Sequence, residues 1–263
     1  MTPEEMGSRL LYRDGLMLII DKPAGLAVHR GPKGGPSLED SFDALRFGLP
    51  RLPALAHRLD KETSGCLVLG RHRKALADLS LLFRNGKVDK TYWAVVEGGP
   101  EAPEGRIDLP LGRLDDKIGW WMKHDPDGLP SSTTWKVMGR AEGLTWLALN
   151  PLTGRTHQLR VHCATMGFPI LGDDIYGPEA VLRRGRKEDA PRRDGPRLHL
   201  HARAIAVPLY KNRPPVAAVA PVPAHMRERL KACGWNEDDD RALAAPLGLS
   251  GPRSAAPMRR SDQ

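Results

Sequence analysis

Glycine and proline divide this chain into short segments. The sequence has 27 glycines and 24 prolines, about a fifth of its 263 residues. They follow no Gly-X-Y period, so the pattern predicts many turns in a globular protein. The apolar runs between the turns are short, as at 16–20, and fall far below the ~20 residues that span a bilayer. We therefore expect a water-soluble protein without a membrane partner.

The apolar spacing predicts an α+β fold. A single folded domain is expected over residues 1–235, followed by a flexible tail over 236–263 whose residues are mostly acidic, small or polar. Because strands outnumber helices and hairpin-like pairs recur, we expect a mixed, mostly antiparallel central sheet flanked by helices and loops. Strand patterns cover 16–20, 67–69, 91–97, 133–138, 144–149, 198–207 and 216–220, and helical patterns cover 37–47, 73–84, 154–167 and 224–233.

Charge and cysteine content narrow the class of protein further. The formal net charge of +8 points to a polyanionic partner. Cys66, Cys163 and Cys233 are far apart, which excludes a disulfide framework and a zinc ribbon. The acidic N-terminus has no signal-peptide apolar core. A reducing, cytoplasmic location is the simplest interpretation.

The segment HRLDKETSGCLVLGR at 57–71 gathers His57, two arginines, a lysine and two acids around a turn. Arg58 and Lys61 are expected to favour the ionised form of Asp60. A fixed, ionised carboxylate suits nucleophilic or base chemistry. The alternative is that Asp60 caps the turn through backbone amides, as loop aspartates commonly do.

A second basic segment is PLTGRTHQLRVHC at 151–163. On a helix, His157, Arg160 and Ala164 would share one face. Arg155 would lie at the helix start, where a positive charge is unfavourable unless an anion lies there too. This mismatch favours a phosphate or carboxylate ligand, and the alternative is a basic surface helix.

Two further features have a functional and a structural interpretation. Tyr92 in KTYWAVVEG offers either an aromatic surface for a nucleobase or, beside Trp93, a core side chain. His199 and His201 fall on one face of a predicted strand, but no nearby carboxylate or cysteine completes a ligand set, so no metal site is expected.

Several common catalytic motifs are missing from the sequence, namely GxxxxGK[ST], GxGxxG after a strand, HExxH and GxSxG. Nucleotide hydrolysis, dinucleotide redox chemistry and α/β-hydrolase chemistry therefore lack their usual support. What remains is a site without a cofactor, built from one carboxylate, arginines and a tyrosine.

That set, in this order, resembles the RluA family of pseudouridine synthases. The resemblance extends over about four-fifths of the chain, roughly from residue 11 to residue 223. It rests on IIDKPAGLAVH at 19–29, HRLDKETSGCLVL at 57–69, KTYWAVVEG at 90–98, PLTGRTHQLRVHCATMGFPILGDDIYG at 151–177 and RLHLHARAI at 197–205.

The resemblance implies the family's catalytic fold and the isomerisation of uridine to pseudouridine in RNA, without metal or cofactor. Asp60 would be the catalytic aspartate, Arg160 would pair with it, and Tyr92 would stack on the uracil or assist proton removal. The target base must be flipped out of its stack. Leu200 would pack against that base, and Arg58 would fill the gap it leaves. The remaining substrate-binding candidates are His57, Arg155 and His157.

The first matching strand begins near residue 11, so the resemblance is to compact members without the small N-terminal RNA-binding domain. Target choice is then expected from the catalytic domain, and tRNA, large-subunit rRNA or both are the candidate substrates. A monomer without an obligate protein partner is the default. Trp120 and Trp121 either pack beside a hairpin or face RNA, and the basic run at 183–197 either contacts phosphates or is solvated.

A non-catalytic RNA-binding or ribosome-assembly module on the same fold is the alternative function. An acid repels phosphate, so Asp60 together with Arg160 and Tyr92 favours the enzyme. A base-removing glycosidase is a third possibility, and it would release free uracil.

Overall fold

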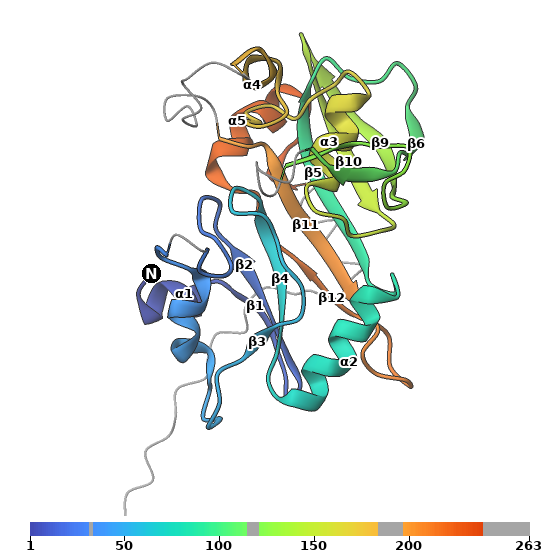
Figure 1. Ribbon diagram of the computed structural model, residues 1–263. Helices are drawn as coiled ribbons and strands as arrows, with labels where there is room; N and C mark the ends of the chain where they lie inside the picture. The colour runs from blue at the N-terminus through green and yellow to red at the C-terminus, as the bar shows by residue number, and fades with distance from the viewer. Residues whose placement is uncertain (32–33, 115–120, 184–196, 239–263) are drawn as a thin grey trace, which may run out of the picture.

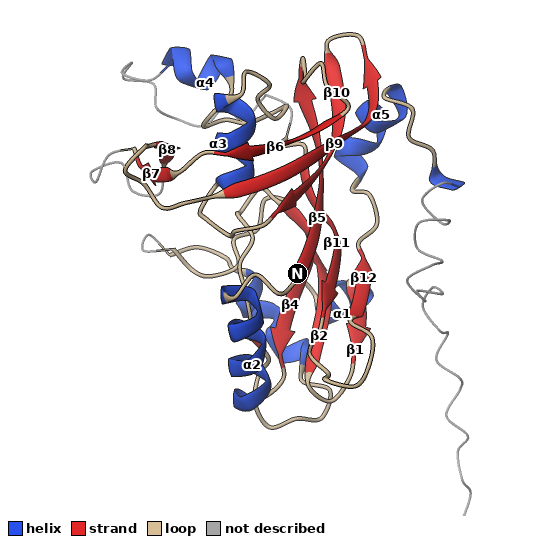
Figure 2. Ribbon diagram, turned by 90° about the vertical axis from the view of Figure 1, so that its right-hand side faces the viewer, coloured by secondary structure: helices blue, strands red, loops and turns tan. Residues whose placement is uncertain are grey.

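The chain folds around one long, twisted sheet, with helices on both of its sides (Figures 1 and 2). This computed structural model describes residues 1–31, 34–114, 121–183 and 197–238. The strand order is β1-β2-β4-β11-β5-β10-β9-β6, with β12 paired to β11 and β3 paired to β4. In this ten-stranded sheet of the described chain, β4 and β11 pair in parallel, and the other pairings are antiparallel. The predicted mixed, mostly antiparallel α+β architecture is confirmed.

The elements follow one another along the chain in mixed order. The strands are β1 (Leu10–Arg13), β2 (Met17–Lys22), β3 (Ala54–Leu55), β4 (Ser64–Gly70), β5 (Asp89–Glu97), β6 (Glu104–Asp108), β7 (Leu111–Arg113), β8 (Met122–His124), β9 (Ser132–Ala141), β10 (Leu144–Pro151), β11 (Leu200–Val207) and β12 (Val216–Val219). The helices are α1 (Pro3–Ser8), the 3-10 helix η1 (Leu38–Leu45), α2 (Arg73–Arg84), α3 (Gln158–Thr165), α4 (Pro178–Arg183) and α5 (Ala224–Ala232).

Helix α2 shows how local sequence fixes an element that frames the site. The ring of His72 accepts a hydrogen bond from Ala75 N (3.3 Å) and caps the first turn. Ala75 and Leu79 are buried on one face, and Asn85-Gly86 ends the helix, with Gly86 at a positive φ of 63°. The predicted bounds of 73–84 are those of the helix.

Three expectations about elements need correction. The helix expected after Ser37 is a 3-10 helix, at whose start the carboxylate of Asp40 accepts a hydrogen bond from Ser37 N (2.8 Å). The helix expected over 154–167 begins only at Gln158, because His157 adopts a left-handed conformation with φ of 51°. Strands β1, β3, β6, β7 and β8 and helices α1 and α4 were not expected from the apolar pattern, and none of these elements has more than six residues.

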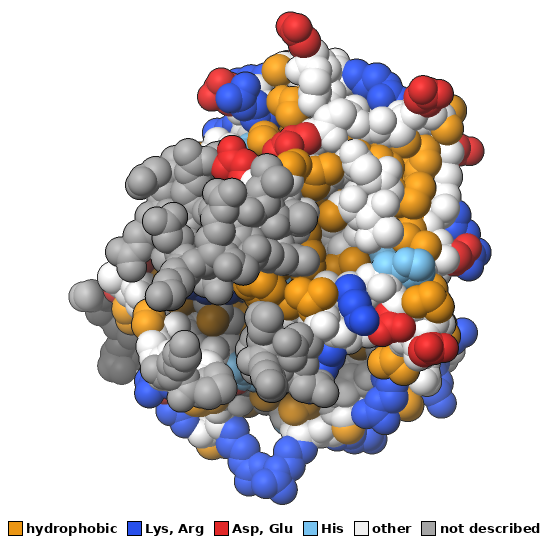
Figure 3. Space-filling view, turned by 45° about the horizontal axis from the view of Figure 1, so that its top comes forward, with side chains coloured by type: hydrophobic (Ala, Val, Ile, Leu, Met, Phe, Trp, Pro, Cys, Tyr) orange, Lys and Arg blue, Asp and Glu red, His pale blue; other side chains and the backbone are white. Residues whose placement is uncertain are grey.

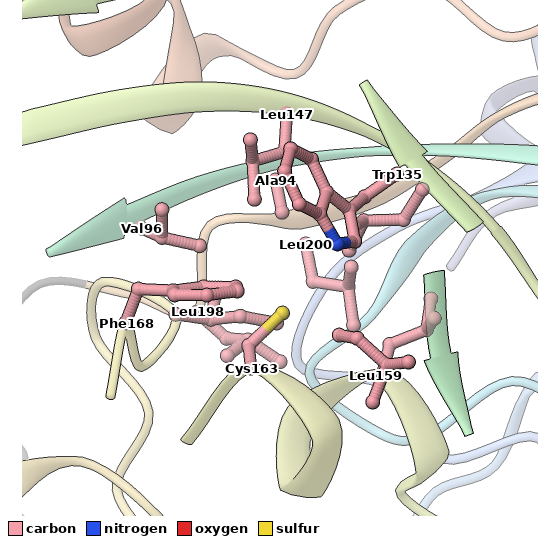
Figure 4. Close-up of a cluster of buried hydrophobic side chains, with 12 residues drawn as sticks. Ala94, Val96, Trp135, Leu147, Leu159, Cys163, Phe168, Leu198 and Leu200 are labelled. Atoms are coloured by element: carbon pink, nitrogen blue, oxygen red, sulfur yellow. The ribbon is translucent and has the colours of Figure 1, made fainter. Parts of the chain in front are cut away.

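The sheet and α3 enclose an apolar cluster that also forms the floor of the site. Leu159 and Cys163 of α3 pack against Ala94 of β5 and Leu200 of β11 (Figure 4). Helix α5 covers the other side of the sheet (Figure 2), where Met226 and Leu230 are buried. In the described ranges, no helix combines the length and apolarity needed to cross a membrane.

Candidate active site

A pocket of about 350 Å³ opens where several distant segments meet. Its walls come from the β3–β4 loop, the end of α2 and the turn between β10 and α3, and its floor comes from β5 and β11. In Figure 2, α2 and α3 lie on the same side of the sheet, one above the other. All eight site residues named from the sequence line this pocket, namely His57, Arg58, Asp60, Tyr92, Arg155, His157, Arg160 and Leu200.

Asp60 lies in the β3–β4 loop with its side chain 21% exposed. The turn is closed by backbone, because the carbonyl of Asp60 accepts a hydrogen bond from Thr63 N (3.2 Å). No hydrogen bond to the carboxylate is formed within the described chain, so the structure does not support a turn-capping role for this side chain. Its one ion pair among the described residues is with His157, whose Nε2 lies 3.9 Å from Oδ2.

A buried lysine holds this loop in place. Lys22 is 0% exposed, and its Nζ donates hydrogen bonds to the carbonyls of Pro23 (2.8 Å), Leu26 (2.8 Å) and Lys61 (3.0 Å). Burial lowers the pKa of Lys22 to about 8, and the carboxylates of Glu62 and Asp60 oppose that shift. The ammonium therefore joins the residue next to Asp60 to the loop that follows β2.

The opposite wall is held by the amide of Gln158, a residue that the sequence reasoning did not single out. Gln158 Oε1 accepts from Thr153 Oγ1 (2.7 Å) and Arg155 N (3.0 Å). Its Nε2 donates to Ser132 O (2.9 Å) and Thr133 Oγ1 (3.0 Å). The buried amide is thus fully bonded, and it ties the turn before α3 to strand β9.

Arg160 does not form the expected ion pair with Asp60. Its guanidinium binds Asp173 in a bidentate arrangement, with Nε to Oδ2 at 2.8 Å and Nη2 to Oδ1 at 2.7 Å, and Nη2 also lies 3.3 Å from Asp174. The planar fork of arginine matches one carboxylate in this way. The side chain of Asp173 is 0% exposed and also accepts from the amides of Ile175 and Tyr176, at 2.9 Å each.

This correction leaves a longer-range interaction between Arg160 and Asp60. The Asp60 carboxylate helps to raise the pKa of Arg160, whereas burial opposes that rise and Asp173 is the main stabilising partner. Hydrogen bonds and the positive charge of Arg160 in turn lower the pKa of Asp173 against its burial. The sequence signal for Asp173 was the pair of acids in GDDIYG.

His157 has a polar neighbour on each side of its ring. Nε2 faces Asp60, and Nδ1 lies 2.8 Å from the hydroxyl of Tyr176. That hydroxyl oxygen already accepts from Met122 N (2.9 Å). The arrangement that pairs every donor has the Tyr176 hydroxyl donating to Nδ1, which places the proton of neutral His157 on Nε2. Burial lowers the pKa of His157, although the carboxylate of Asp60 opposes this.

Tyr92 and Leu200 supply the apolar floor. Tyr92 is half-buried, and burial followed by the nearby Asp60 charge raises the pKa of its hydroxyl. Its neighbour Trp93 points to the other side of the sheet and packs edge-to-face on Trp146, with ring centroids 4.7 Å apart. Tyr92 therefore both lines the pocket and packs on the core, so its two interpretations are compatible.

The three remaining predicted residues differ in how many contacts hold their side chains in place. His57 stacks on Phe83 with centroids 4.1 Å apart and accepts from Val68 N (3.0 Å), and burial lowers its pKa to about 3. Arg58 is exposed, with no hydrogen bond or ion pair of its side chain in the described chain. Arg155 is exposed and donates to Pro130 O (3.2 Å). It precedes α3 by three residues, so the argument from the helix start does not apply.

The other sequence interpretations have mixed outcomes. His199 and His201 are buried, and their Nδ1 atoms bond to Arg197 O and Ser64 Oγ. No group of three or more potential metal ligands is found in the described parts of the chain.

Trp121 is half-buried beside the β7–β8 hairpin, and its carbonyl accepts from Leu114 N (2.8 Å). Trp120, residues 184–196 of the basic run and residues 239–263 of the tail lie outside the described residues.

Comparison with known proteins identifies the family. The family model for RNA pseudouridylate synthase matches residues 16–165. The chain belongs to this family. The match spans the Asp60 loop, Tyr92 and Arg160, and the named relatives place the chain among its RluA-type members. It is therefore an RNA pseudouridine synthase, an isomerase.

Individual relatives agree with this assignment. The chain is 42% identical to an uncharacterized RNA pseudouridine synthase of Zymomonas mobilis, over 83% of this chain and 95% of that protein. It is 35% identical to ribosomal large subunit pseudouridine synthase C of Vibrio cholerae, over 86% and 69% respectively. Among solved structures, human RNA pseudouridylate synthase domain containing 4 superposes with a TM-score of 0.69 at 28% identity, covering 87% of this chain and 95% of that one.

Proposed function

We propose that this synthase isomerises specific uridines in structured RNA, with large-subunit ribosomal RNA as the first candidate substrate and tRNA as the second. The name of the Vibrio cholerae relative supports the first choice, since it refers to the ribosomal large subunit. The net charge of +8 suits a polyanion. On the face shown in Figure 3, Lys and Arg side chains gather along the lower edge.

In the proposed reaction the uracil is flipped from its stack into the pocket. The bond from ribose C1′ to ring N1 breaks and a bond from C1′ to C5 forms. The proton of C5 leaves and N1 gains one, so the reaction needs no oxidant or reductant. Asp60 is the essential carboxylate, Tyr92 and Leu200 contact the base, and Arg58 fills the gap in the RNA.

Arg160 has a modified role in this proposal. Its guanidinium is held by Asp173, so it acts on Asp60 through its positive charge across the pocket and not through a direct ion pair. His157 presents Nε2 to Asp60 instead. The remaining candidates, His57 and Arg155, contribute to the pocket wall, with His57 kept neutral by burial.

One observation carries the proposal: the Asp60 carboxylate has no hydrogen bond from any described residue, yet it lines the same pocket as Tyr92 and Leu200. A carboxylate kept only for stability is normally paired when it is partly buried. An unpaired one beside an apolar floor is available to a bound ribose or base.

Pseudouridine mapping tests the proposal. Total RNA from a gene-deleted strain is compared with RNA from strains rescued by the wild type or by Asp60→Ala, using carbodiimide-based sequencing. We expect one or a few pseudouridines to disappear on deletion and to return only with the wild type. If no site in rRNA or tRNA changes, the substrate assignment is wrong. Free uracil released from treated RNA would indicate a glycosidase instead.

We further infer a monomer that acts in the cytoplasm without an obligate protein partner. Light scattering of the purified protein and cell fractionation test these two points, and a stable dimer or a membrane-bound fraction would contradict them.

A further inference from the structure

Lys90 lines the pocket but has no role in the chemistry above. It lies on β5 two residues before Tyr92, so the two side chains project from the same side of the sheet. At about 3.4 Å per residue, they lie about 7 Å apart along the strand. Lys90 is half-buried, and burial lowers its pKa, an effect that the neighbouring Asp89 opposes.

The ammonium of Lys90 has no partner in the described chain, since neither a hydrogen bond nor an ion pair involves its Nζ. Lys22 provides the contrast within the same molecule, because its buried Nζ donates to three carbonyls. A partly buried charge without a partner is unfavourable, and proteins normally pair such a group. The geometry therefore points to a ligand that brings a negative charge.

The surroundings of Lys90 indicate which ligand this is. Arg58 and Arg84 line the same pocket and are exposed, and neither forms an ion pair with a described residue. Asp60 is the one carboxylate among the described lining residues. Apart from Asp60, the charged side chains among the described lining residues are thus cationic, whereas Tyr92 and Leu200 on the floor are aromatic and apolar.

We propose that Lys90 binds a backbone phosphate of the RNA at the nucleotide held in the pocket. A nucleotide carries its base and its phosphate on different sides of the ribose, which matches an apolar floor beside an unpaired cation. This inference deepens the proposed function and rests on it, since it assigns the subsite for the phosphate of the same substrate.

The salt dependence of binding tests this assignment. Affinity for an oligouridylate is measured by fluorescence anisotropy across a series of KCl concentrations for the wild type and for Lys90→Met. Each phosphate contact in a single strand contributes about 0.7 to the slope of log K against log salt. We expect Lys90→Met to flatten the slope by about 0.7 and to bind about tenfold more weakly at low salt, the effect of one charge-assisted hydrogen bond.

Matched variants separate a phosphate contact from a structural effect. Lys90→Arg should retain the slope, and Lys90→Gln should lose it, even if the methionine variant folds poorly. Lys74→Met is the control, because Lys74 is exposed near the other end of α2, ten residues from Arg84. An unchanged slope in Lys90→Met and Lys90→Gln would overturn the proposal.

The same data keep this inference distinct from the proposed function. If the wild type forms pseudouridine but the slope is unchanged in the variants, the phosphate subsite is wrong and the function stands. If no RNA is modified but the slope changes, Lys90 binds phosphate and the proposed reaction fails.

Discussion

The two walls of the pocket hold their aspartates in opposite ways. The side chain of Asp173, which binds Arg160, is 0% exposed and accepts hydrogen bonds from a bidentate guanidinium and two backbone amides. Asp60, on the facing loop, is 21% exposed and has a single ion-pair contact at 3.9 Å in the described chain. The carboxylate of Asp173 forms hydrogen bonds within the fold, whereas the carboxylate of Asp60 is positioned by backbone bonds of its loop and is left open to a ligand.

This difference explains how a stable fold can leave one carboxylate open to a ligand. Lys22 and the turn bond to Thr63 fix the loop through carbonyl groups. Gln158, Asp173 and Tyr176 fix the other wall through side chains. Neither set of bonds uses the carboxylate oxygens of Asp60. Loss of Asp60 should therefore affect activity alone, and loss of Asp173 should affect folding first.

The largest expected effect is on catalysis in Asp60→Asn. The substitution keeps the shape of the side chain and removes its charge, so activity should fall on the order of 10⁴-fold, as when a catalytic aspartate is neutralised elsewhere. The free energy of unfolding should change by less than about 0.5 kcal/mol, since no described group depends on this carboxylate. Single-turnover assays and urea unfolding check the two parts, and a large loss of stability would contradict the comparison.

The next effect is on stability in Asp173→Ala. The substitution leaves the buried guanidinium of Arg160 without its main partner, and breaking a buried pair typically costs about 3–5 kcal/mol. Urea unfolding measures the change. Asp43→Ala is the control, because Asp43 forms a surface pair with Arg46 and is 80% exposed. That variant should lose less than about 1 kcal/mol. Equal losses in the two variants would show that the buried pair contributes no more stability than the surface pair.

A smaller effect concerns pH. The folded pKa of His57 is about 3, below the value of about 6.5 for a free histidine. Between these values the unfolded chain binds the extra proton, so stability is fully present above about pH 6.5 and is lost as the pH falls toward 3. Other buried histidines contribute with the same sign, so the comparison of variants isolates this group.

Replacing His57 by Gln should flatten the plot of unfolding free energy against pH between about 6 and 4. The expected change is at most about 1.4 kcal/mol per pH unit. The exposed His124, replaced by Gln, is the control. A wild-type slope in His57→Gln would mean that His57 gains its proton in the folded state.

The smallest effect is expected for Tyr176→Phe, which removes the hydroxyl that donates to His157. Since a hydrogen bond to the neutral ring disfavours its charged form, the pKa of His157 should rise in this variant. Activity should fall about fivefold, in line with about 1 kcal/mol for one hydrogen bond. Nitrogen-15 spectra of the ring should show an unprotonated Nδ1 in the wild type.

Tyr210→Phe is the matched control for this variant, because its hydroxyl bonds to Asp14, which does not line the pocket. The ring signals of His157 should not change there. A protonated Nδ1 in the wild type would contradict the tautomer assigned from the hydrogen bonds.

Local patterns in the sequence predicted much of the fold. Apolar spacing and Asn85-Gly86 gave the bounds of α2. The same approach gave too long an α3, because the left-handed turn at His157 depends on bonds from Gln158 to a distant strand. Strands β6 to β8 have only three to five residues each, too few to show a local periodicity.

The site, like the fold, was predicted only in part. Motif order brought eight residues to one pocket, but it assigned the wrong partner to Arg160. Asp173 is thirteen positions from Arg160, and only the fold decides which of several carboxylates reaches the guanidinium. Tyr176 gave no signal as a partner of His157, because a tyrosine near the end of an acidic turn has many possible roles.

The most direct test of the central claim measures tritium released from uridine C5. RNA labelled at that carbon is incubated with the purified wild type, Asp60→Asn and Asp43→Ala, and the products are digested and separated. The account predicts that the wild type and Asp43→Ala release tritium and form pseudouridine in equal amounts, while folded Asp60→Asn releases none. Release by Asp60→Asn at a rate near that of the wild type would show that the open carboxylate is not the group on which the reaction depends.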